Sequence, residues 1–169
     1  EYDSIGNFTV NFDTDVDRAG AVDKNGLPIN RNRFIALMAS IVLEEHPGTT
    51  IVTDSVTSSG LTKWIEKLGG IHHRFKRGYK NVINESIRLN KKNISCELAL
   101  ETSGHGALKE NYFLDDGAYQ ISKILIKLSQ LHQNNSGSID ELIKDLEQPI
   151  DEIEFRPIIK CKDYLMYAD

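Results

Sequence analysis

The first residues able to do chemistry form an acidic run, in which Asp13, Asp15 and Asp17 alternate and Arg18 follows. Three carboxylates this close repel one another unless a cation or protons lie between them. Carboxylate oxygens suit Mg²⁺, which also takes a phosphate oxygen and water as ligands. A guanidinium is a planar fork that can bind phosphate. The run therefore predicts a magnesium site beside a phosphate-binding arginine, a combination that stabilises phosphoryl transfer.

Two simpler interpretations of the acidic run are a solvated turn and a calcium loop. A solvated turn needs no ligand, because charge clusters usually lie on the surface. A calcium loop of the EF-hand type needs glycine at its sixth position and glutamate at its twelfth. Those positions hold Arg18 and Lys24, and the run comes after an expected strand, so the calcium loop is excluded.

A third interpretation is a phosphatase of the haloacid-dehalogenase type, in which Asp13 would be the phosphorylated nucleophile and Asp15 the acid/base. Thr53 at a strand end and the pair Asp115–Asp116 could stand for the later motifs of that fold. This interpretation remains the alternative, although it gives no role to Asp17, Arg18 or the loop that begins at Glu101.

The Glu101 loop places Glu101, Ser103 and His105 at alternate positions. A carboxylate that accepts two O–H donors, a hydroxyl and an imidazole together suit the vicinal hydroxyls of a sugar. Taken alone, however, this loop reads more simply as a polar turn with a structural glutamate.

Strands and helices must position both loops, and the hydrophobic periodicity predicts them. Strands are expected over 8–12, 49–53, 71–75 and 95–100, with a hairpin over 19–30. Helices are expected over 31–46, 61–68 and 81–89, over a long stretch capped by Asp115 or Asp116, and over a short one between Ser138 and Pro149. This alternation predicts an α/β fold, three-layer αβα with a mixed, mostly parallel sheet. Both loops would lie at the carboxyl ends of strands, where such sheets bind ligands.

Composition excludes several classes of protein. The 169 residues carry a net charge of −5, which gives no basic surface for a nucleic acid. No apolar run is long enough to span a membrane. The two cysteines, Cys96 and Cys161, match no metal or redox spacing and indicate reduced thiols in a cytoplasmic protein.

The order of the motifs resembles the α-D-phosphohexomutase superfamily of phosphomannomutases and phosphoglucomutases. Asp13-x-Asp15-x-Asp17-Arg18 is followed about eighty residues later by Glu101-x-Ser103-Gly-His105, and Asp115-Asp116-Gly117 then opens a helix. The resemblance extends over residues 9–131, and residues 77–81 stand where the family has a further substrate loop.

The resemblance implies an internal fragment of a four-domain enzyme. Residues 1–30 would end the metal-binding second domain, residues 31–135 would form the sugar-binding third domain, and residues 136–169 would lead toward a fourth. Such enzymes interconvert hexose 1-phosphate and hexose 6-phosphate through a hexose 1,6-bisphosphate and an enzyme phosphoserine. The family's serine loop and phosphate clamp are missing here, so the fragment alone is expected to be inactive and to depend on further domains of its polypeptide.

Carried over by position, the resemblance implies a role for each motif residue. Mg²⁺ would be bound by Asp13, Asp15 and Asp17, and Arg18 would face the substrate or the phosphoserine in a catalytic role. The sugar phosphate substrate would be bound by Glu101, Ser103, His105, Tyr79 and Lys80. Two departures leave the choice between glucose and mannose open: residues 54–57 contain no lysine, and Tyr79 stands where some members have histidine.

Overall fold

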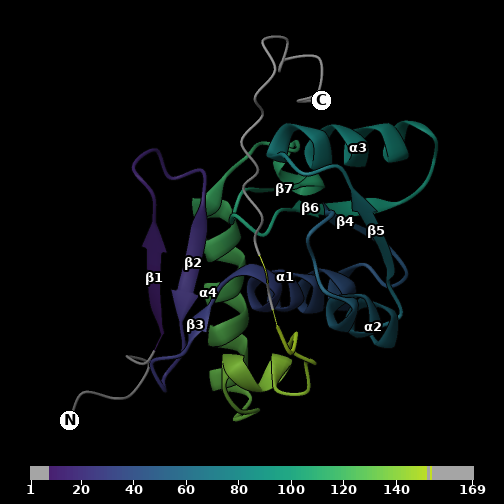
Figure 1. The fold of residues 1–169 in the computed structure, drawn as a ribbon. Helices are drawn as coiled ribbons and strands as arrows, with labels where there is room; N and C mark the ends of the chain where they lie inside the picture. The colour runs from purple at the N-terminus through teal and green to yellow at the C-terminus, as the bar shows by residue number, and fades with distance from the viewer. Residues whose placement is uncertain (1–7, 152, 154–169) are drawn as a thin grey trace.

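A small antiparallel sheet opens the part of the chain that the computed structural model describes, residues 8–151 and 153 (Figure 1). Its strands pair in the order β1 (Thr9–Phe12), β2 (Ala19–Val22) and β3 (Pro28–Ile29). The hairpin expected over 19–30 is therefore confirmed. Its turn is held by Asp23, whose Oδ1 accepts the backbone N–H groups of Asn25 and Leu27, each at 2.9 Å.

A second sheet of four strands forms the centre of the fold. Its spatial order is β5 (Ile71–Phe75), β4 (Thr50–Asp54), β6 (Cys96–Leu100) and β7 (Gly106–Leu108). β4 pairs in parallel with β5 and β6, whereas β7 runs antiparallel to β6. The sheet is thus mixed and mostly parallel, as expected. Sequence periodicity missed β7 because three residues are too short to establish a period.

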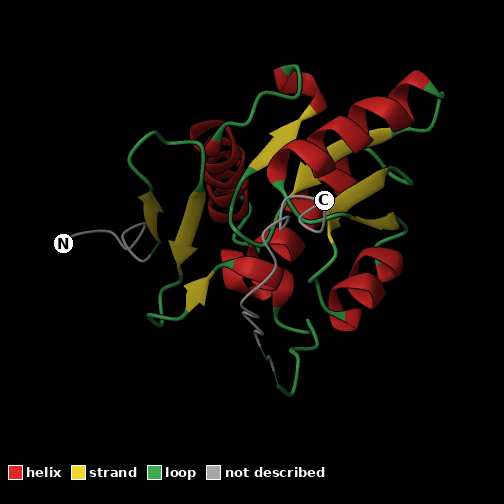
Figure 2. Ribbon diagram, turned by 45° about the horizontal axis from the view of Figure 1, so that its top comes forward, coloured by secondary structure: helices red, strands yellow, loops and turns green. Residues whose placement is uncertain are grey.

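Helices cover both faces of the central sheet, which gives the expected αβα layers (Figures 1 and 2). Alternate residues of the strands divide between two apolar clusters, because successive side chains of a strand point to opposite faces. Ile51 belongs to the cluster that contains helices α1 (Arg31–Glu45) and α2 (Ser59–Lys67). Val52 belongs to the other cluster, under α3 (Tyr79–Lys91).

Helix α4 (Gly117–Gln133) lies between the two sheets and joins them into one body (Figure 2). Its N-cap is Asp116, whose Oδ1 accepts the Tyr119 N–H at 2.9 Å. Its apolar residues at helical spacing form a stripe that is buried at Ile121 and Ile124, whereas Leu125 is 47% exposed. The helical period of 3.6 residues places Leu125 at the edge of this stripe. No described element fully covers that edge of the helix.

The short helix expected after Ser138 is a 3₁₀ helix, η3 (Ile139–Ile143), and a second one, η2 (Lys109–Asn111), precedes α4. Ser138 and Glu141 have the spacing of a capping box, but the box is not formed, because the Ser138 hydroxyl donates to the Glu141 carboxylate at 3.2 Å and caps no backbone N–H. The sequence also has an apolar run at 155–159, which lies outside the described residues, as does Cys161. Within the described part, Cys96 is a buried free thiol, and no helix is long and apolar enough to cross a membrane.

His72 and His73 lie on opposite faces of β5, so they cannot share an ion, as their alternation predicts. The His72 ring is held between the hydroxyls of Thr53 and Thr62, at 2.8 Å and 2.7 Å. The His73 ring bonds Glu85 of α3 at 2.9 Å. Burial, with the positive charge of Arg74 nearby, lowers the pKa of His72 to about 4. His72 is therefore neutral in the folded protein at neutral pH.

The lowered pKa of His72 predicts an acid-sensitive stability. The unfolded chain takes up the proton near pH 6.5 and the folded chain only near pH 4. The free energy of unfolding should therefore fall on acidification through this window, by up to about 1.4 kcal/mol per pH unit from this group. Urea unfolding of the chain between pH 7.5 and 4.5 should show a shallower loss in His72→Gln than in the wild type. Equal slopes would contradict this origin, and the exposed His132→Gln serves as control.

Candidate functional site

The two loops singled out in the sequence lie against each other, although they belong to different sheets. The acidic loop connects β1 and β2 of the small sheet, so it does not lie at the carboxyl end of the central sheet as expected. The Glu101 loop does, because it comes directly after β6. Arg18 forms an isolated antiparallel bridge with His105, and the Ala19 N–H donates to the Gly104 carbonyl at 3.4 Å.

Two glycines permit this close approach. Gly104 has a φ of 99°, and a Cβ at this position would lie 2.7 Å from the Ala19 carbonyl oxygen. A Cβ on Gly117, the first residue of α4, would lie 2.9 Å from the carbonyl oxygens of Val16 and Arg18. The Gly117 N–H instead donates to the Val16 carbonyl at 3.1 Å. The acidic loop is thus fixed between the Glu101 loop and the start of α4.

Within the acidic loop, Arg18 is bound to Asp13. The Arg18 Nε donates to Asp13 Oδ2 at 2.5 Å, and the Arg18 backbone N–H donates to Oδ1 at 3.2 Å. Desolvation raises the pKa of Asp13, but these bonds and the Arg18 charge outweigh it, so the pKa lies below its usual value. The arginine side chain remains half exposed and can still turn toward a ligand.

The three aspartates of the loop fit a magnesium ion. One carboxylate oxygen from each of Asp13, Asp15 and Asp17 lies within 4.8 Å of the others. The Oδ1 atom of Asp17 is buried and has no hydrogen-bond partner among the described residues. Buried carboxylate oxygens are normally paired or bound to a cation. The donors are all hard oxygens, as Mg²⁺ prefers.

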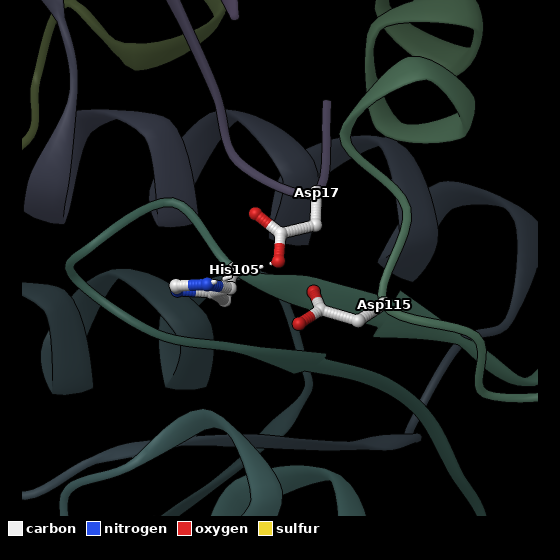
Figure 3. A group of neighbouring side chains, drawn as sticks. All are labelled: Asp17, His105 and Asp115. Atoms are coloured by element: carbon white, nitrogen blue, oxygen red, sulfur yellow. Dashed lines mark ion pairs between the residues drawn. The ribbon is translucent and has the colours of Figure 1, made fainter. Parts of the chain in front are cut away.

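Asp115 joins this group from the segment that precedes α4 (Figure 3). Figure 3 shows the side chains of Asp17, His105 and Asp115 gathered at one place. His105 Nε2 lies 3.4 Å from Asp17 Oδ2. The Gly106 N–H donates to Asp115 Oδ1 at 2.9 Å, but Oδ2 is buried without a partner in the described part of the chain. Burial and the charges of Asp17 and Glu101 raise the pKa of Asp115 to about 6, although His105 opposes the shift.

Sequence reasoning missed this position of Asp115, because it treated Asp115 and Asp116 as equivalent helix caps. A signal was present in the doublet itself. One helix start uses one N-cap side chain, and Asp116 takes that role, so the second aspartate required another partner.

The Glu101 side chain is buried and holds two loops together. Its Oε1 accepts the Gly78 N–H and its Oε2 accepts the Ser103 hydroxyl, each at 2.7 Å. Ser103 Oγ also lies 3.0 Å from His105 Nδ1. Gly78 has a φ of 115°, a backbone conformation that residues other than glycine rarely adopt. A sugar hydroxyl that reaches this carboxylate would therefore compete with bonds already formed within the protein.

The first turn of α3, which begins at Tyr79 rather than at residue 81 as expected, supplies an aromatic contact. The Tyr79 ring stacks on the His105 ring with centroids 4.7 Å apart and planes 16° apart. Lys80 Nζ lies 5.7 Å from the centroid of the Tyr79 ring. The structure thus brings together every residue for which the sequence predicted a site role: Asp13, Asp15, Asp17, Arg18, Tyr79, Lys80, Glu101, Ser103 and His105.

The phosphatase alternative finds no comparable support in the described residues. Asp13 comes after β1, which pairs antiparallel with β2 in the small sheet and not within the parallel strands. Thr53 bonds His72 and Thr57 on the α2 side of the central sheet, rather than the acidic loop.

Comparison with known proteins adds an independent result. The family model described as phosphoglucomutase/phosphomannomutase, alpha/beta/alpha domain III, matches residues 30–149. The phosphomannomutase/phosphoglucomutase of Pseudomonas putida is 32% identical over 139 residues, which cover 82% of this chain and 29% of that protein. The phosphoglucomutase of Neisseria gonorrhoeae is 34% identical over 139 residues, with coverage of 82% and 29%.

A solved structure agrees with these relatives. A phosphoglucomutase/phosphomannomutase family protein from Burkholderia thailandensis matches with a TM-score of 0.70 and 30% identity, covering 85% of this chain and 30% of that one. The chain therefore spans about a third or less of the length of the relatives it matches.

The raised pKa of Asp115 predicts that Asp115→Asn stabilises the protein at pH 7.5. The folded state there holds a charged carboxylate against Asp17 and Glu101, whereas an asparagine Oδ1 can keep the Gly106 bond. We expect the free energy of unfolding to rise by about 1 to 2 kcal/mol, less than the full shift implies because the residue is partly exposed. Denaturant unfolding of both proteins at pH 7.5 without divalent ions measures this difference in the free energy of unfolding. Asp116→Asn, which keeps the cap, is the control, and a loss of stability in Asp115→Asn would refute the repulsion.

Proposed function

Because this chain belongs to the phosphoglucomutase/phosphomannomutase family, we propose that it is the metal- and sugar-binding part of a phosphohexomutase. The complete enzyme would interconvert hexose 1-phosphate and hexose 6-phosphate through a hexose 1,6-bisphosphate. The observation that carries the proposal is the contact of the acidic loop with the Glu101 loop, through the Arg18–His105 bridge. It places a phosphate-binding and a hydroxyl-binding set of residues side by side.

In this proposal, the Glu101 carboxylate and the Ser103 hydroxyl bind two neighbouring sugar hydroxyls. Their present mutual bond of 2.7 Å holds both groups in place until the sugar replaces it. The sugar bisphosphate must bind in two orientations. In each orientation it can present a pair of neighbouring hydroxyls to Glu101 and Ser103. Tyr79 and His105 would form the wall beside the sugar, since their rings are stacked.

Arg18 and Lys80 would bind the phosphate groups of the substrate. The guanidinium of Arg18 is exposed enough to exchange Asp13 for a phosphate. Lys80 is exposed as well and lies in the first turn of α3, whose N-cap Gly78 is bonded to Glu101. Water must be excluded while the phosphoryl group moves, and we assign this task to further domains of the polypeptide.

Mg²⁺ is the cofactor in this proposal, held by Asp13, Asp15 and Asp17. The ion would neutralise charge on the transferring phosphoryl group. The protein's own contribution is to keep the three carboxylates together despite their repulsion, through the Arg18 bonds to Asp13 and the contact of His105 with Asp17. A cytoplasmic location belongs to the same proposal, in keeping with the free thiol of Cys96.

The relatives are named for glucose, for mannose or for both. No observation in the described fold or in the comparisons favours a phosphatase that uses Asp13 covalently.

A coupled mutase assay of the complete gene product tests the proposal. With Mg²⁺ and a trace of hexose bisphosphate, glucose 1-phosphate or mannose 1-phosphate should be converted to the 6-phosphate. Glu101→Gln should lower kcat/KM by about 10- to 100-fold, because a charged acceptor of hydroxyl bonds is lost. Glu97→Gln is the matched control, since Glu97 lies on β6, the strand that ends just before Glu101, and accepts a bond from Lys109 instead. Steady phosphate release without conversion, abolished in Asp13→Asn, would favour the phosphatase instead.

Metal binding can be tested on this chain without substrate. Mn²⁺, detected by the loss of its free EPR signal, should bind and be displaced by Mg²⁺. Asp15→Asn should weaken binding by about tenfold or more, because one of three charged ligands is lost. Asp145→Asn makes the same change at an exposed residue whose partner is Lys67. Equal weakening in both variants would argue for nonspecific attraction rather than a site.

A further inference from the structure

A buried carboxylate beneath the Glu101 loop has no role in the proposed binding of metal or substrate. Asp54 is the last residue of the central strand β4, and none of its surface is exposed. Its Oδ2 accepts two bonds from Thr102, from the hydroxyl at 2.6 Å and from the backbone N–H at 3.2 Å. Its Oδ1 is buried without a hydrogen-bond partner among the described residues. Such a group is unfavourable to bury, so its presence requires an explanation.

The electrostatic surroundings make the position of Asp54 more unfavourable still. Burial raises the pKa of Asp54 and the two Thr102 bonds lower it in part, while the nearby charge of Glu101 raises it and that of Arg77 lowers it. An apolar residue at this position would avoid both the desolvation cost and the repulsion by Glu101. The bonds to Thr102 are the contribution that such a residue would lose.

Thr102 is the residue between the two proposed sugar ligands, Glu101 and Ser103. The loop is closed on itself by bonds from the Glu101 N–H to the His105 carbonyl at 2.8 Å, and from the Gly104 N–H to the Glu101 carbonyl at 3.0 Å. These bonds define the shape of the loop but not its place above the sheet.

The place of the loop is set just beyond the end of the β4–β6 pairing. The last backbone pair of these two strands joins Thr53 to Leu100. Past this pair, the carboxylate of Asp54 binds Thr102 across the same gap. Asp54 therefore extends the connection between the central strand and the loop by side-chain bonds, at the point where the backbone ladder ends.

We propose that Asp54 is a positioning residue for sugar recognition, which holds Thr102 so that Glu101 and Ser103 present their oxygens to a hexose phosphate. The inference rests on the proposed function for its ligand, while the anchoring itself depends on the fold alone. A small misplacement of binding groups can lower a rate by about 100-fold, so an anchor of this kind has a large effect without touching substrate.

The choice of variants comes from the two bonds. Asp54→Ala removes both of them. Asp54→Asn can keep both, because they end on a single oxygen that the amide Oδ1 can replace. Thr53→Val is the matched control for loss of a buried polar group. Thr53 is the preceding residue of the same strand and equally buried, but its hydroxyl bonds His72 and Thr57 rather than the loop.

The first experiment measures amide hydrogen exchange in this chain without any ligand. In Asp54→Ala, the amides of Thr102 and Gly104 should exchange about tenfold faster than in the wild type, relative to amides of β4 and β5. In Asp54→Asn and Thr53→Val, the exchange rates of the loop amides should change only as much as those of the strand amides. A uniform change across the chain in Asp54→Ala would overturn the anchoring role.

The second experiment measures kinetics in the complete protein. Asp54→Ala should raise KM for hexose 1-phosphate by about 10- to 100-fold, Asp54→Asn should recover much of the loss, and Thr53→Val should retain wild-type KM. A loosened loop with an unchanged KM would overturn the role in sugar recognition. A wild-type protein without mutase activity would contradict the proposed function, whereas the exchange experiment would still decide whether Asp54 anchors the loop.

Discussion

The site depends on one close backbone contact, between the start of β2 and the turn from β6 to β7. Arg18 and Ala19 lie against Gly104 and His105, and the approach is possible because Gly104 has no side chain. This contact joins a small antiparallel sheet to the central sheet. Without it, the aspartate loop and the hydroxyl-binding loop would belong to separate surfaces. All the chemistry inferred for the protein depends on their being adjacent.

Bringing these loops together concentrates negative charge. Arg18 neutralises Asp13, and His105 lies near both Asp17 and Glu101, at 3.4 Å and 3.9 Å. Buried oxygens of Asp17 and Asp115 nevertheless have no hydrogen-bond partner within the described residues. Close carboxylates favour a proton or a cation between them. The fold thus favours a bound positive charge at the place where a phosphate-binding site needs a metal ion. The raised pKa of Asp115 is a consequence of the same crowding of carboxylates and of burial.

Buried polar residues support the loops from below. Gln120 of α4, fully buried, donates from Nε2 to the carbonyls of Gly104 and Gly106, at 3.4 Å and 3.2 Å. Asp54 holds the other side of the same loop through Thr102. Apolar packing can fix helices against sheets, but it does not fix the position of a polar loop relative to the sheet below it. These side chains connect the apolar core to the position of Glu101, so the precision of the site derives from the interior.

The sequence by itself determined the elements and the chemistry of the loops. The strand over 71–75 and the start of α1 at residue 31 could be predicted from local periodicity and turn residues, because those patterns record which face of a segment is apolar. Only the tertiary structure decided the partners. It placed the acidic loop on a separate sheet, added the short β7, separated Asp115 from the cap Asp116 and gave Asp54 its bond to Thr102. These contacts join residues far apart in the chain. A local sequence pattern does not indicate which distant segment will pack against it.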